Sequence, residues 1–531
     1  MVIILNLNEA RKTAMASTGL LVVSNVKHLG KSLRSIEKYV SSLYIHLNVT
    51  GSTSNSLTTP PPVWGRLISQ LYANSSSYVG NKIDLRVLVS PLRPGVDVPL
   101  KLRKPVDLIF SDSHHPELCD KLRAALNVSK PTIFLEDSSS TDLGSHEDNS
   151  QEQKMYPSVV LGGTFDRIHL GHKIFLTQAV LRTCKRLVVG VTTAAMTKSK
   201  TLPDLILPVE ERIALLREFL TDIDSTLQYE IVPIDDPFGP TQHDPDMDMI
   251  VVSAETLRGG QKVNEIRSGK QLRELDIFVI DIVESNVNDG IHETKISSSN
   301  TRIDLLGSRW RKPEPRPHLP IRPHIIGLTG GIASGKSKMA ERLSNMGAHV
   351  IDCDKVAHDV YEPGQVCYKR IVQHFGTTIL SSNGRIDRAK LGPLVFGNPL
   401  ELQALNEIVW PQLIEEVNRR LDSLRAGSEV PKVVVLEAAV LLRAGWESNC
   451  HEVWSMIVPP EEAVKRVMAR NSLSEAEARK RLSSQVSNHE IVAKSHVIFS
   501  SQWDYEFTQK QADRAWKILN SELDSQHSSS L

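Results

Sequence analysis

The sequence predicts a multi-domain α/β protein, and three observations carry this prediction. Strand-like apolar runs alternate with helical segments along most of the 531 residues. Two glycine-rich turns, at 162–163 and 330–335, each follow such a run and precede a helical segment. Two stretches without apolar periodicity, at 137–154 and 309–322, interrupt the alternation. A chain of this length has room for about three or four domains, so we expect doubly wound parallel sheets joined by linkers.

The two interruptions differ in composition. Residues 137–154 are rich in serine and acidic residues, which indicates a flexible linker. Residues 311–320 are dense in proline, which is typical of an extended connector. The expected parts are an N-terminal α/β domain over 1–136, a flexible linker over 137–154, a middle domain over 155–308, a proline-rich linker over 309–322, a C-terminal domain over 323–523 and a frayed polar tail over 524–531.

Periodicity places the elements of each domain. In the N-terminal domain the expected elements are strands at 85–90, 106–111 and 132–135 and a helix at 116–126. In the middle domain they are strands at 158–161, 186–191 and 249–252 and helices at 170–184 and 210–219. In the C-terminal domain they are strands at 325–328, 348–351 and 433–436, a helix at 336–345 and a charged helix pair at 461–470 and 474–485.

The first 38 residues are basic, with six Lys or Arg and only Glu9 and Glu37 as acids. This composition has two interpretations. It is typical of a mitochondrial address or anchor, and it also fits the first strand and helix of a folded domain. The role of residues 1–136 stays open.

The overall composition excludes several classes of protein. Lys+Arg and Asp+Glu both total 62, so no net field favours nucleic acid as a substrate. The five cysteines form no CxxC spacing, which argues against a zinc site or a disulfide framework. No run approaches the roughly 20 apolar residues of a membrane-spanning helix.

The first glycine turn lies in a longer motif that runs from Gly162 to His172. Gly162 and Gly163 let the backbone approach a phosphate chain closely, and Thr164 can donate from its hydroxyl and its amide. His169 and His172, three residues apart at a helix start, share one face, and the helix N-terminus favours a bound anion. The motif therefore predicts a site for nucleotide phosphates.

A second motif, Lys295 to Arg302, supplies a facing set of donors. Lys295 precedes a helix and Arg302 lies in its first turns, and the serines that begin this helix are Ser297, Ser298 and Ser299. An isolated His-x-Gly-His is more often a structural histidine pair, but the two motifs together favour nucleotidyl transfer. Class I aminoacyl-tRNA synthetases use a similar pair of motifs. The middle domain, of about 150 residues, has neither a tRNA-binding extension nor an excess of basic residues.

These motifs resemble phosphopantetheine adenylyltransferase in its animal form, with supporting matches at 208–212, 236–240 and 251–256. The resemblance implies a Rossmann-like nucleotidyltransferase domain that joins the adenylyl group of ATP to 4′-phosphopantetheine, giving dephospho-coenzyme A and pyrophosphate. It implies that His172 and Thr164 contact the reacting phosphate. Either Lys198 or Lys200 is the expected basic clamp, and the spacing does not decide between them.

The second turn matches G-x-x-x-x-G-K-S at every position and has the strand and helix that a P-loop requires. Lys336 is expected to reach the β- and γ-phosphates, and the Ser337 hydroxyl to ligate Mg²⁺. The backbone N–H groups that would wrap the phosphates belong to Gly330, Gly331, Ile332, Ala333, Ser334 and Gly335.

Asp354 follows the next strand, where a carboxylate can orient and deprotonate an attacking hydroxyl; a helix cap is the commoner role for an isolated Asp. The charged helix pair carries Arg470 and Arg481 and resembles a closing lid. Residues 323–520 resemble dephospho-coenzyme A kinase, which implies phosphorylation of the ribose 3′-hydroxyl with Asp354 as base and with Lys336 and Arg470 stabilising charge. Trp410-Pro411 and the segment 437–443 depart from the bacterial pattern, so the acceptor-binding details stay open.

Both halves together resemble the bifunctional coenzyme A synthases of animals. The resemblance implies two consecutive reactions, each with Mg²⁺ and ATP, on 4′-phosphopantetheine and then dephospho-coenzyme A. We expect a monomer in the cytoplasm or at mitochondria, either peripherally on the outer membrane or in the matrix. The alternatives are a catalytically retired scaffold that binds nucleotide or coenzyme A, and a two-module signalling NTPase.

Overall fold

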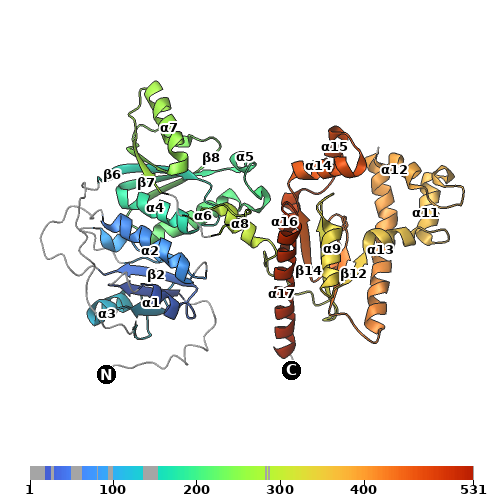
Figure 1. The fold of residues 1–531 in the computed structure, drawn as a ribbon, viewed down its shortest axis with the longest axis horizontal. Helices are drawn as coiled ribbons and strands as arrows, with labels where there is room; N and C mark the ends of the chain where they lie inside the picture. The colour runs from blue at the N-terminus through green and yellow to red at the C-terminus, as the bar shows by residue number, and fades with distance from the viewer. Residues whose placement is uncertain are drawn as a thin grey trace. The chain divides into compact units, whose positions relative to one another are not determined.

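The computed structural model describes residues 18–24, 29–48, 63–79, 82–93, 100–135, 154–281, 284, 287–396 and 398–529. The chain forms two compact units, Met1–Thr301 and Arg302–Leu531 (Figure 1). The expected flexible linker, except for Lys154, and the first 17 residues of the basic stretch lie outside the described residues. No described helix is long and apolar enough to cross a membrane.

The N-terminal part of the first unit is a five-stranded parallel sheet in the order β3-β2-β1-β4-β5. The strand β1 and the helix α1 fall within the early basic stretch, so the described residues 18–24 and 29–36 belong to the folded domain. The elements are β1 (Thr18–Val23), α1 (Leu29–Ile36), β2 (Ser42–Leu47), α2 (Val63–Val79), β3 (Asp84–Val87), η3 (Ser90–Leu92), β4 (Leu108–Ser111), α3 (Pro116–Ala125) and β5 (Ile133–Phe134).

The middle sheet is also parallel and has the order β10-β9-β6-β7-β8. Its strand order reverses between β6 and β9, and α/β proteins bind ligands at such a switch point. The elements are β6 (Tyr156–Gly163), α4 (Leu170–Arg182), β7 (Thr183–Thr192), α5 (Ala194–Thr197), η4 (Pro203–Leu205), α6 (Val209–Ile223), β8 (Gln228–Ile234), η5 (Gly239–Gln242), β9 (Met249–Ser253), η6 (Ala254–Thr256), α7 (Leu257–Gly269), β10 (Asp276–Ile280) and α8 (Ser298–Leu305).

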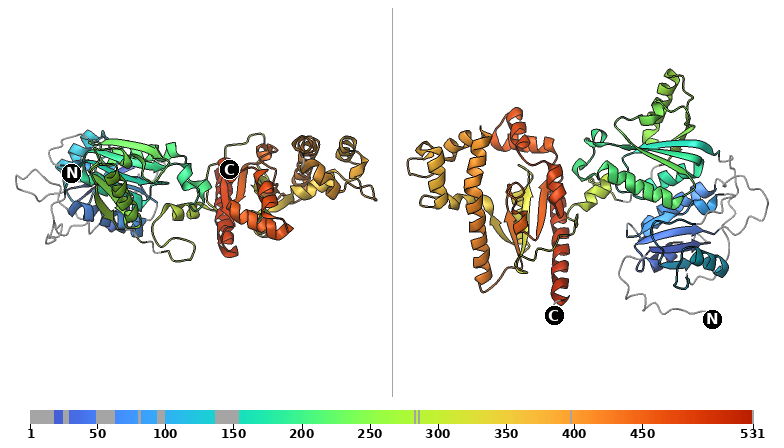
Figure 2. Two further views of the ribbon diagram at one scale, coloured as in Figure 1. Left: turned by 90° about the horizontal axis from the view of Figure 1, so that it is seen from above. Right: turned by 180° about the vertical axis from the view of Figure 1, so that it is seen from behind.

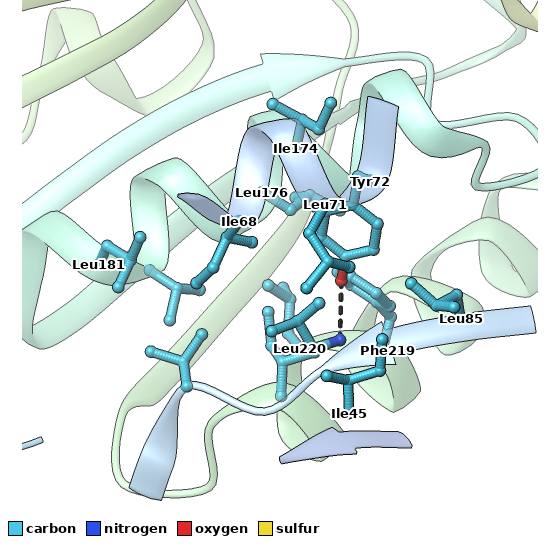
Figure 3. Packing of buried hydrophobic residues seen from close by; sticks show 14 of the residues in the cluster. Ile45, Ile68, Leu71, Tyr72, Leu85, Ile174, Leu176, Leu181, Phe219 and Leu220 are labelled. Carbon is cyan, nitrogen blue, oxygen red and sulfur yellow. Dashed lines mark hydrogen bonds between the residues drawn. The ribbon is translucent and has the colours of Figure 1, made fainter. Parts of the chain in front are cut away.

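These first two sheets share one hydrophobic core. Helix α2 of the N-terminal part lies beside α4 of the middle part, between the two sheets (Figure 1). Figure 3 shows this core from close by, with side chains from α2, α4, α6, β2 and β3 interlocking. The residues labelled there are Ile45, Ile68, Leu71, Tyr72, Leu85, Ile174, Leu176, Leu181, Phe219 and Leu220.

The second unit is built on a third parallel sheet in the order β12-β13-β11-β14-β15. Its elements are β11 (His324–Gly330), α9 (Lys336–Asn345), β12 (His349–Asp352), α10 (Cys353–Val360), α11 (Val366–Phe375), η7 (Thr377–Ile379), α12 (Arg388–Phe396), α13 (Pro399–Ala426), β13 (Val433–Glu437), η8 (Trp446–Asn449), β14 (Glu452–Ile457), α14 (Pro460–Asn471), α15 (Glu475–Ser483), α16 (Asn488–Lys494), β15 (Val497–Ser500) and α17 (Tyr505–Ser529).

Helices cover both faces of this third sheet. The side chains of β13 alternate, so that Val434 and Leu436 face a core completed by α10 and α13, while Val433 and Val435 face α9 and α17. Figure 2 shows α13 and α17 flanking the sheet. The polar tail expected from Asp524 onward continues α17 as helix to Ser529, because Leu519 and Leu523 anchor the preceding turns on the sheet.

Candidate active sites

The first candidate site lies where β6 ends and α4 begins, at the switch point of the middle sheet. Gly162 and Gly163 are the last residues of β6. His169 caps α4: its ring Nδ1 accepts from the His172 backbone N–H at 3.4 Å. Gly171 leaves room for the His169 ring, because a Cβ there would lie 3.2 Å from it, closer than an ordinary van der Waals contact. The helix N-terminus therefore faces the end of the strand, as the sequence predicts.

The two histidine rings stack on each other, with centroids 3.8 Å apart. His172 also packs against Phe165, with centroids 5.3 Å apart. The pKa of His172 lies well below its usual value, because burial disfavours the charged ring and because the neighbouring His169 disfavours a second positive charge. Its Nδ1 is buried and has no hydrogen-bond partner among the described residues. A neutral ring with an unused polar atom is suited to hydrogen bonding with a bound ligand.

Thr164 is held in place by buried polar groups behind it. Its carbonyl accepts a hydrogen bond from Arg212 at 2.6 Å, and Arg212 also donates to the carbonyls of Thr192 and Leu207. The Thr192 hydroxyl is 3.1 Å from the Thr164 hydroxyl. Arg212 is 2% exposed, so this member of the 208–212 match supports the loop and does not face a ligand.

The second motif of this site meets the first. The Ser298 hydroxyl donates to the carbonyl of Asp166 at 2.9 Å, which ties the start of α8 to the loop after β6. The Ser297 hydroxyl accepts from the Asn300 N–H at 3.2 Å. Lys295 is paired with Glu255 at 2.6 Å, and this ion pair raises its pKa against the opposing effect of burial. The motifs at 162–172, 251–256 and 295–302 thus converge at one end of the sheet.

Four residues predicted for the first site are not among the contacts described above. Ser299 is half-buried in α8 and Arg302 is 1% exposed in the same helix. Lys198 and Lys200 are both exposed just after α5. Neither lysine forms an ion pair within the part of the chain that the structure describes, so the choice between them as phosphate clamp stays a prediction.

The second candidate site is the turn between β11 and α9. Gly330 has φ +156°, and a Cβ there would lie 2.5 Å from the Met456 carbonyl and 2.7 Å from the Ser334 hydroxyl. Gly335 has φ +88° and immediately precedes α9. The Ser501 hydroxyl donates to the Ser334 carbonyl at 2.9 Å. The turn therefore has the strained, glycine-dependent backbone of a phosphate-binding loop.

Glu437 at the end of β13 contacts both reactive side chains of this loop. Its Oε1 lies 3.0 Å from the Lys336 ammonium and 2.6 Å from the Ser337 hydroxyl. The glutamate is 6% exposed. Sequence reasoning counted Glu437 only as a departure from the bacterial acceptor pattern. The parallel pairing of β11 with β13 is the signal that places it beside the loop.

The two aspartates after β12 have different roles. Asp352 caps α10 and accepts from the N–H groups of Asp354 and Lys355, both at 3.1 Å. The side-chain carboxylate of Asp354 has no hydrogen-bond partner among the described residues. The surrounding protein reduces the solvation of this carboxylate and raises its pKa. The negative charges of Asp352 and Glu437 raise the pKa further, and the positive charge of Lys336 opposes them. The structure thus leaves Asp354 available for proton transfer and assigns the cap to Asp352.

The charged helix pair is α14 and α15, and α15 ends at Ser483, two residues before the expected end at 485. Arg466 of α14 and Gln485, which follows α15, contact the loop. Gln485 accepts from the Ile332 N–H at 2.7 Å. Arg466 donates to the Ala333 carbonyl at 3.2 Å and to the Ser501 hydroxyl at 2.7 Å. Arg470 and Arg481 are exposed, and within the described residues neither donates to the loop. Their expected roles thus stay predictions, and Arg466 is the arginine of this helix pair that contacts the loop and that the sequence did not indicate.

The comparisons with known proteins fall on these same two sites. A Dephospho-CoA kinase family model matches residues 324–504, and a Cytidylyltransferase-like model matches residues 160–303. Dephospho-CoA kinase from Carboxydothermus hydrogenoformans is 40% identical over 187 residues, which are 35% of this chain and 90% of the relative. The kinase from Moorella thermoacetica is 39% identical over 199 residues, 38% of this chain and 93% of the relative.

Among solved structures, TT1252 from Thermus thermophilus is 32% identical and has a TM-score of 0.32, covering 38% of this chain and 98% of its own. The folds and sites define a protein that joins a nucleotidyltransferase-like domain to a P-loop kinase domain. Through its second unit the chain belongs to the dephospho-CoA kinase family.

Proposed function

We propose that the chain catalyses the last two steps of coenzyme A synthesis, as the fused synthases of animals do. The observation that supports this most directly is that one chain matches both the cytidylyltransferase-like model, over residues 160–303, and the dephospho-CoA kinase model, over residues 324–504. The product of the first proposed reaction is the substrate of the second.

In the first reaction an oxygen of the 4′-phosphate attacks the α-phosphorus of ATP. The bond from that phosphorus to the bridging oxygen breaks, and pyrophosphate leaves. The nucleophile is already an anion, so the site needs positioning and charge stabilisation and no strong base. His172 and Thr164 supply neutral donors at the helix N-terminus, while Arg212 and Ser298 hold the loop that presents them.

In the second reaction the ribose 3′-oxygen attacks the γ-phosphorus of a second ATP, and ADP leaves. Asp354 takes the proton of the attacking hydroxyl, and its raised pKa strengthens it as a base. Lys336 binds the phosphates through its ammonium. Its pairing with Glu437 holds this side chain at the loop before nucleotide arrives.

The residues at the loop fit a magnesium ion. Ser337 and Glu437 bring a hydroxyl and a carboxylate oxygen side by side, and Mg²⁺ prefers such oxygen ligands together with phosphates and water. When bound, the ion would neutralise charge on the phosphates. Among the described residues no group of three His, Cys, Asp or Glu could hold a metal ion.

The test is to incubate the full chain with ATP, Mg²⁺ and 4′-phosphopantetheine and to separate the products. We expect dephospho-coenzyme A, coenzyme A, pyrophosphate and ADP. Formation of ADP and inorganic phosphate without any adenylylated product would contradict the proposal. Binding of coenzyme A without turnover in either step would favour the retired scaffold.

A further inference from the structure

We propose that the N-terminal sheet positions the first site, with Asp84 acting through Lys173 on the histidine-bearing helix start. This inference rests on the proposed adenylyl transfer. The residues concerned lie in one compact unit and join β3 of the N-terminal sheet to α4 of the middle domain.

Lys173 is the residue directly after His172, and its side chain points away from the site into the shared core. Its ammonium donates to Asp84 Oδ1 at 2.7 Å and to the Leu85 carbonyl at 2.9 Å. The Lys173 side chain is only 7% exposed. Both of its partners belong to β3, so the middle domain by itself does not satisfy this buried charge.

The partner of Lys173 is itself fixed by further groups. Asp84 also pairs with Arg86 at 2.7 Å, and Arg86 binds Asp222 and Glu218 of α6. Tyr44 of β2 donates to the same Asp222 at 2.7 Å. Burial opposes ionisation of Asp84, but Lys173 and Arg86 outweigh it and hold its pKa below the usual range. The network thus spans β2, β3, α4 and α6.

Further apolar and polar contacts hold the rest of α4 against α2. Gln178 donates to the Gly65 carbonyl at 2.6 Å and to the Ser69 hydroxyl at 2.9 Å, both on α2. Ile68 and Leu71 of α2 pack in the same core as Ile174 (Figure 3).

The first turn of α4 needs such support because the loop before it carries backbone strain. Phe165 and Arg167 both have φ +49°, a left-handed conformation that is unfavourable for a non-glycine residue unless its surroundings hold it. The stacked rings of His169 and His172 are set by this turn. A displacement of about 1 Å at a reacting group can cost as much as 100-fold in rate. Lys173 is therefore a positioning residue and not a catalytic one.

The experiment compares three substitutions in the full chain. Lys173→Met keeps most of the side-chain length and removes the charge, and Asp84→Asn keeps the shape and removes the opposite charge. The matched control is Lys104→Met. Lys104 is the other lysine on Asp84, at 3.2 Å, but it lies in the N-terminal part and is 36% exposed. The readouts are kcat and KM for pyrophosphate release, and hydrogen exchange of a peptide over 168–176.

For Lys173→Met and for Asp84→Asn we expect kcat of pyrophosphate release to fall roughly 10-fold, with the KM for ATP little changed. The double variant should lose no more than either single one, because both act through one contact. Exchange over 168–176 should become faster in these variants, and Lys104→Met should resemble the unmodified chain in every readout.

Folded Lys173→Met protein with unchanged kcat and exchange would overturn the proposal. It would also be overturned if neither Lys173→Met nor Asp84→Asn folds, because the pair would then serve the core alone. If the unmodified chain releases no pyrophosphate, the proposed adenylyl transfer is contradicted. The positioning role of Asp84 is then still tested by the hydrogen exchange of the peptide over 168–176.

Discussion

His172 combines a lowered pKa with a buried ring nitrogen, Nδ1, that has no hydrogen-bond partner in the described part of the chain. Most buried side-chain polar atoms are hydrogen-bonded, so a ligand atom is the partner that we expect for this nitrogen. We predict that His172→Ala lowers dephospho-coenzyme A formation on the order of 100-fold or more, as for loss of one transition-state donor. Kinase activity on supplied dephospho-coenzyme A in the same preparation is the control and should be unchanged. Near-normal adenylyl transfer would exclude His172 from the reaction.

Asp354 should control the pH dependence of the second step. Its raised pKa means that protonation, which disables a base, occurs at higher pH than for an ordinary Asp near 3.9. We predict that kcat/KM for dephospho-coenzyme A falls on the acid side below this raised pKa. Asp354→Asn should lower phosphoryl transfer on the order of 100-fold while ATP still binds, because the amide cannot accept the proton. An equal loss of ATP affinity, measured by calorimetry, would instead assign Asp354 to nucleotide or metal binding.

Some site residues could be predicted from the sequence because a short motif encodes them. The positions of Lys336 and Ser337 follow from the loop and the helix that it opens, and Asp354 follows from the end of the next strand. Glu437 could not be predicted, because it lies 100 residues beyond Ser337 and reaches it only through the pairing of β13 with β11. Arg466 was missed for a similar reason.

At the scale of elements, the strands of alternating α/β segments were the most predictable. The strands expected at 158–161, 249–252 and 325–328 all form, because each is a short apolar run that is buried on both faces. The helix expected over 170–184 ends at Arg182, since the chain enters β7 at Thr183 without a loop. There the Thr183 hydroxyl donates back to the Ala179 carbonyl at 2.7 Å. No turn residue marks this boundary in the sequence.

The end of β13 yields a prediction at this scale, since the strand brings a carboxylate to the phosphate-binding turn. We predict that Glu437→Gln raises the Mg²⁺ concentration needed for half-maximal kinase activity about 10-fold or more, because it removes a charged oxygen beside Ser337. The measurement is a Mg²⁺ titration at saturating ATP. The first step, assayed in the same protein, is the control. An unchanged Mg²⁺ requirement would show that Glu437 only holds Lys336.

At the scale of the whole molecule, the N-terminal sheet is not an independent appendage. The sequence favours its removal without loss of either reaction, because every catalytic group lies beyond the linker. The structure favours the competing view that the sheet packs on the nucleotidyltransferase domain, with one core and ion pairs from Arg86 and Arg93 to Asp222 and Asp224. Interdomain packing of this kind leaves no local pattern in the sequence. Cellular location and oligomeric state stay predictions.

We therefore predict that deletion of residues 1–136 makes the first unit unstable. The deletion exposes the apolar faces of α4 and α6 that pack on the N-terminal sheet, and it removes the polar partners of Lys173 and Asp222. Adenylyl transfer should be lost and the protein should become prone to aggregation, while kinase activity of the second unit persists. A soluble truncated protein with full activity in both steps would contradict this view.

The most direct test of the two-site account is the origin of the phosphorus atoms in coenzyme A. Parallel reactions of the full chain with 4′-phosphopantetheine would contain ATP labelled with ³²P either at the α- or at the γ-position. Adenylyl transfer retains the α-phosphorus and releases the other two as pyrophosphate, and the kinase adds a γ-phosphorus to the 3′-hydroxyl. If both steps occur, each coenzyme A molecule carries one ³²P atom in the reaction with α-labelled ATP and one ³²P atom in the reaction with γ-labelled ATP. A product with only the γ-label, or with none, would contradict it.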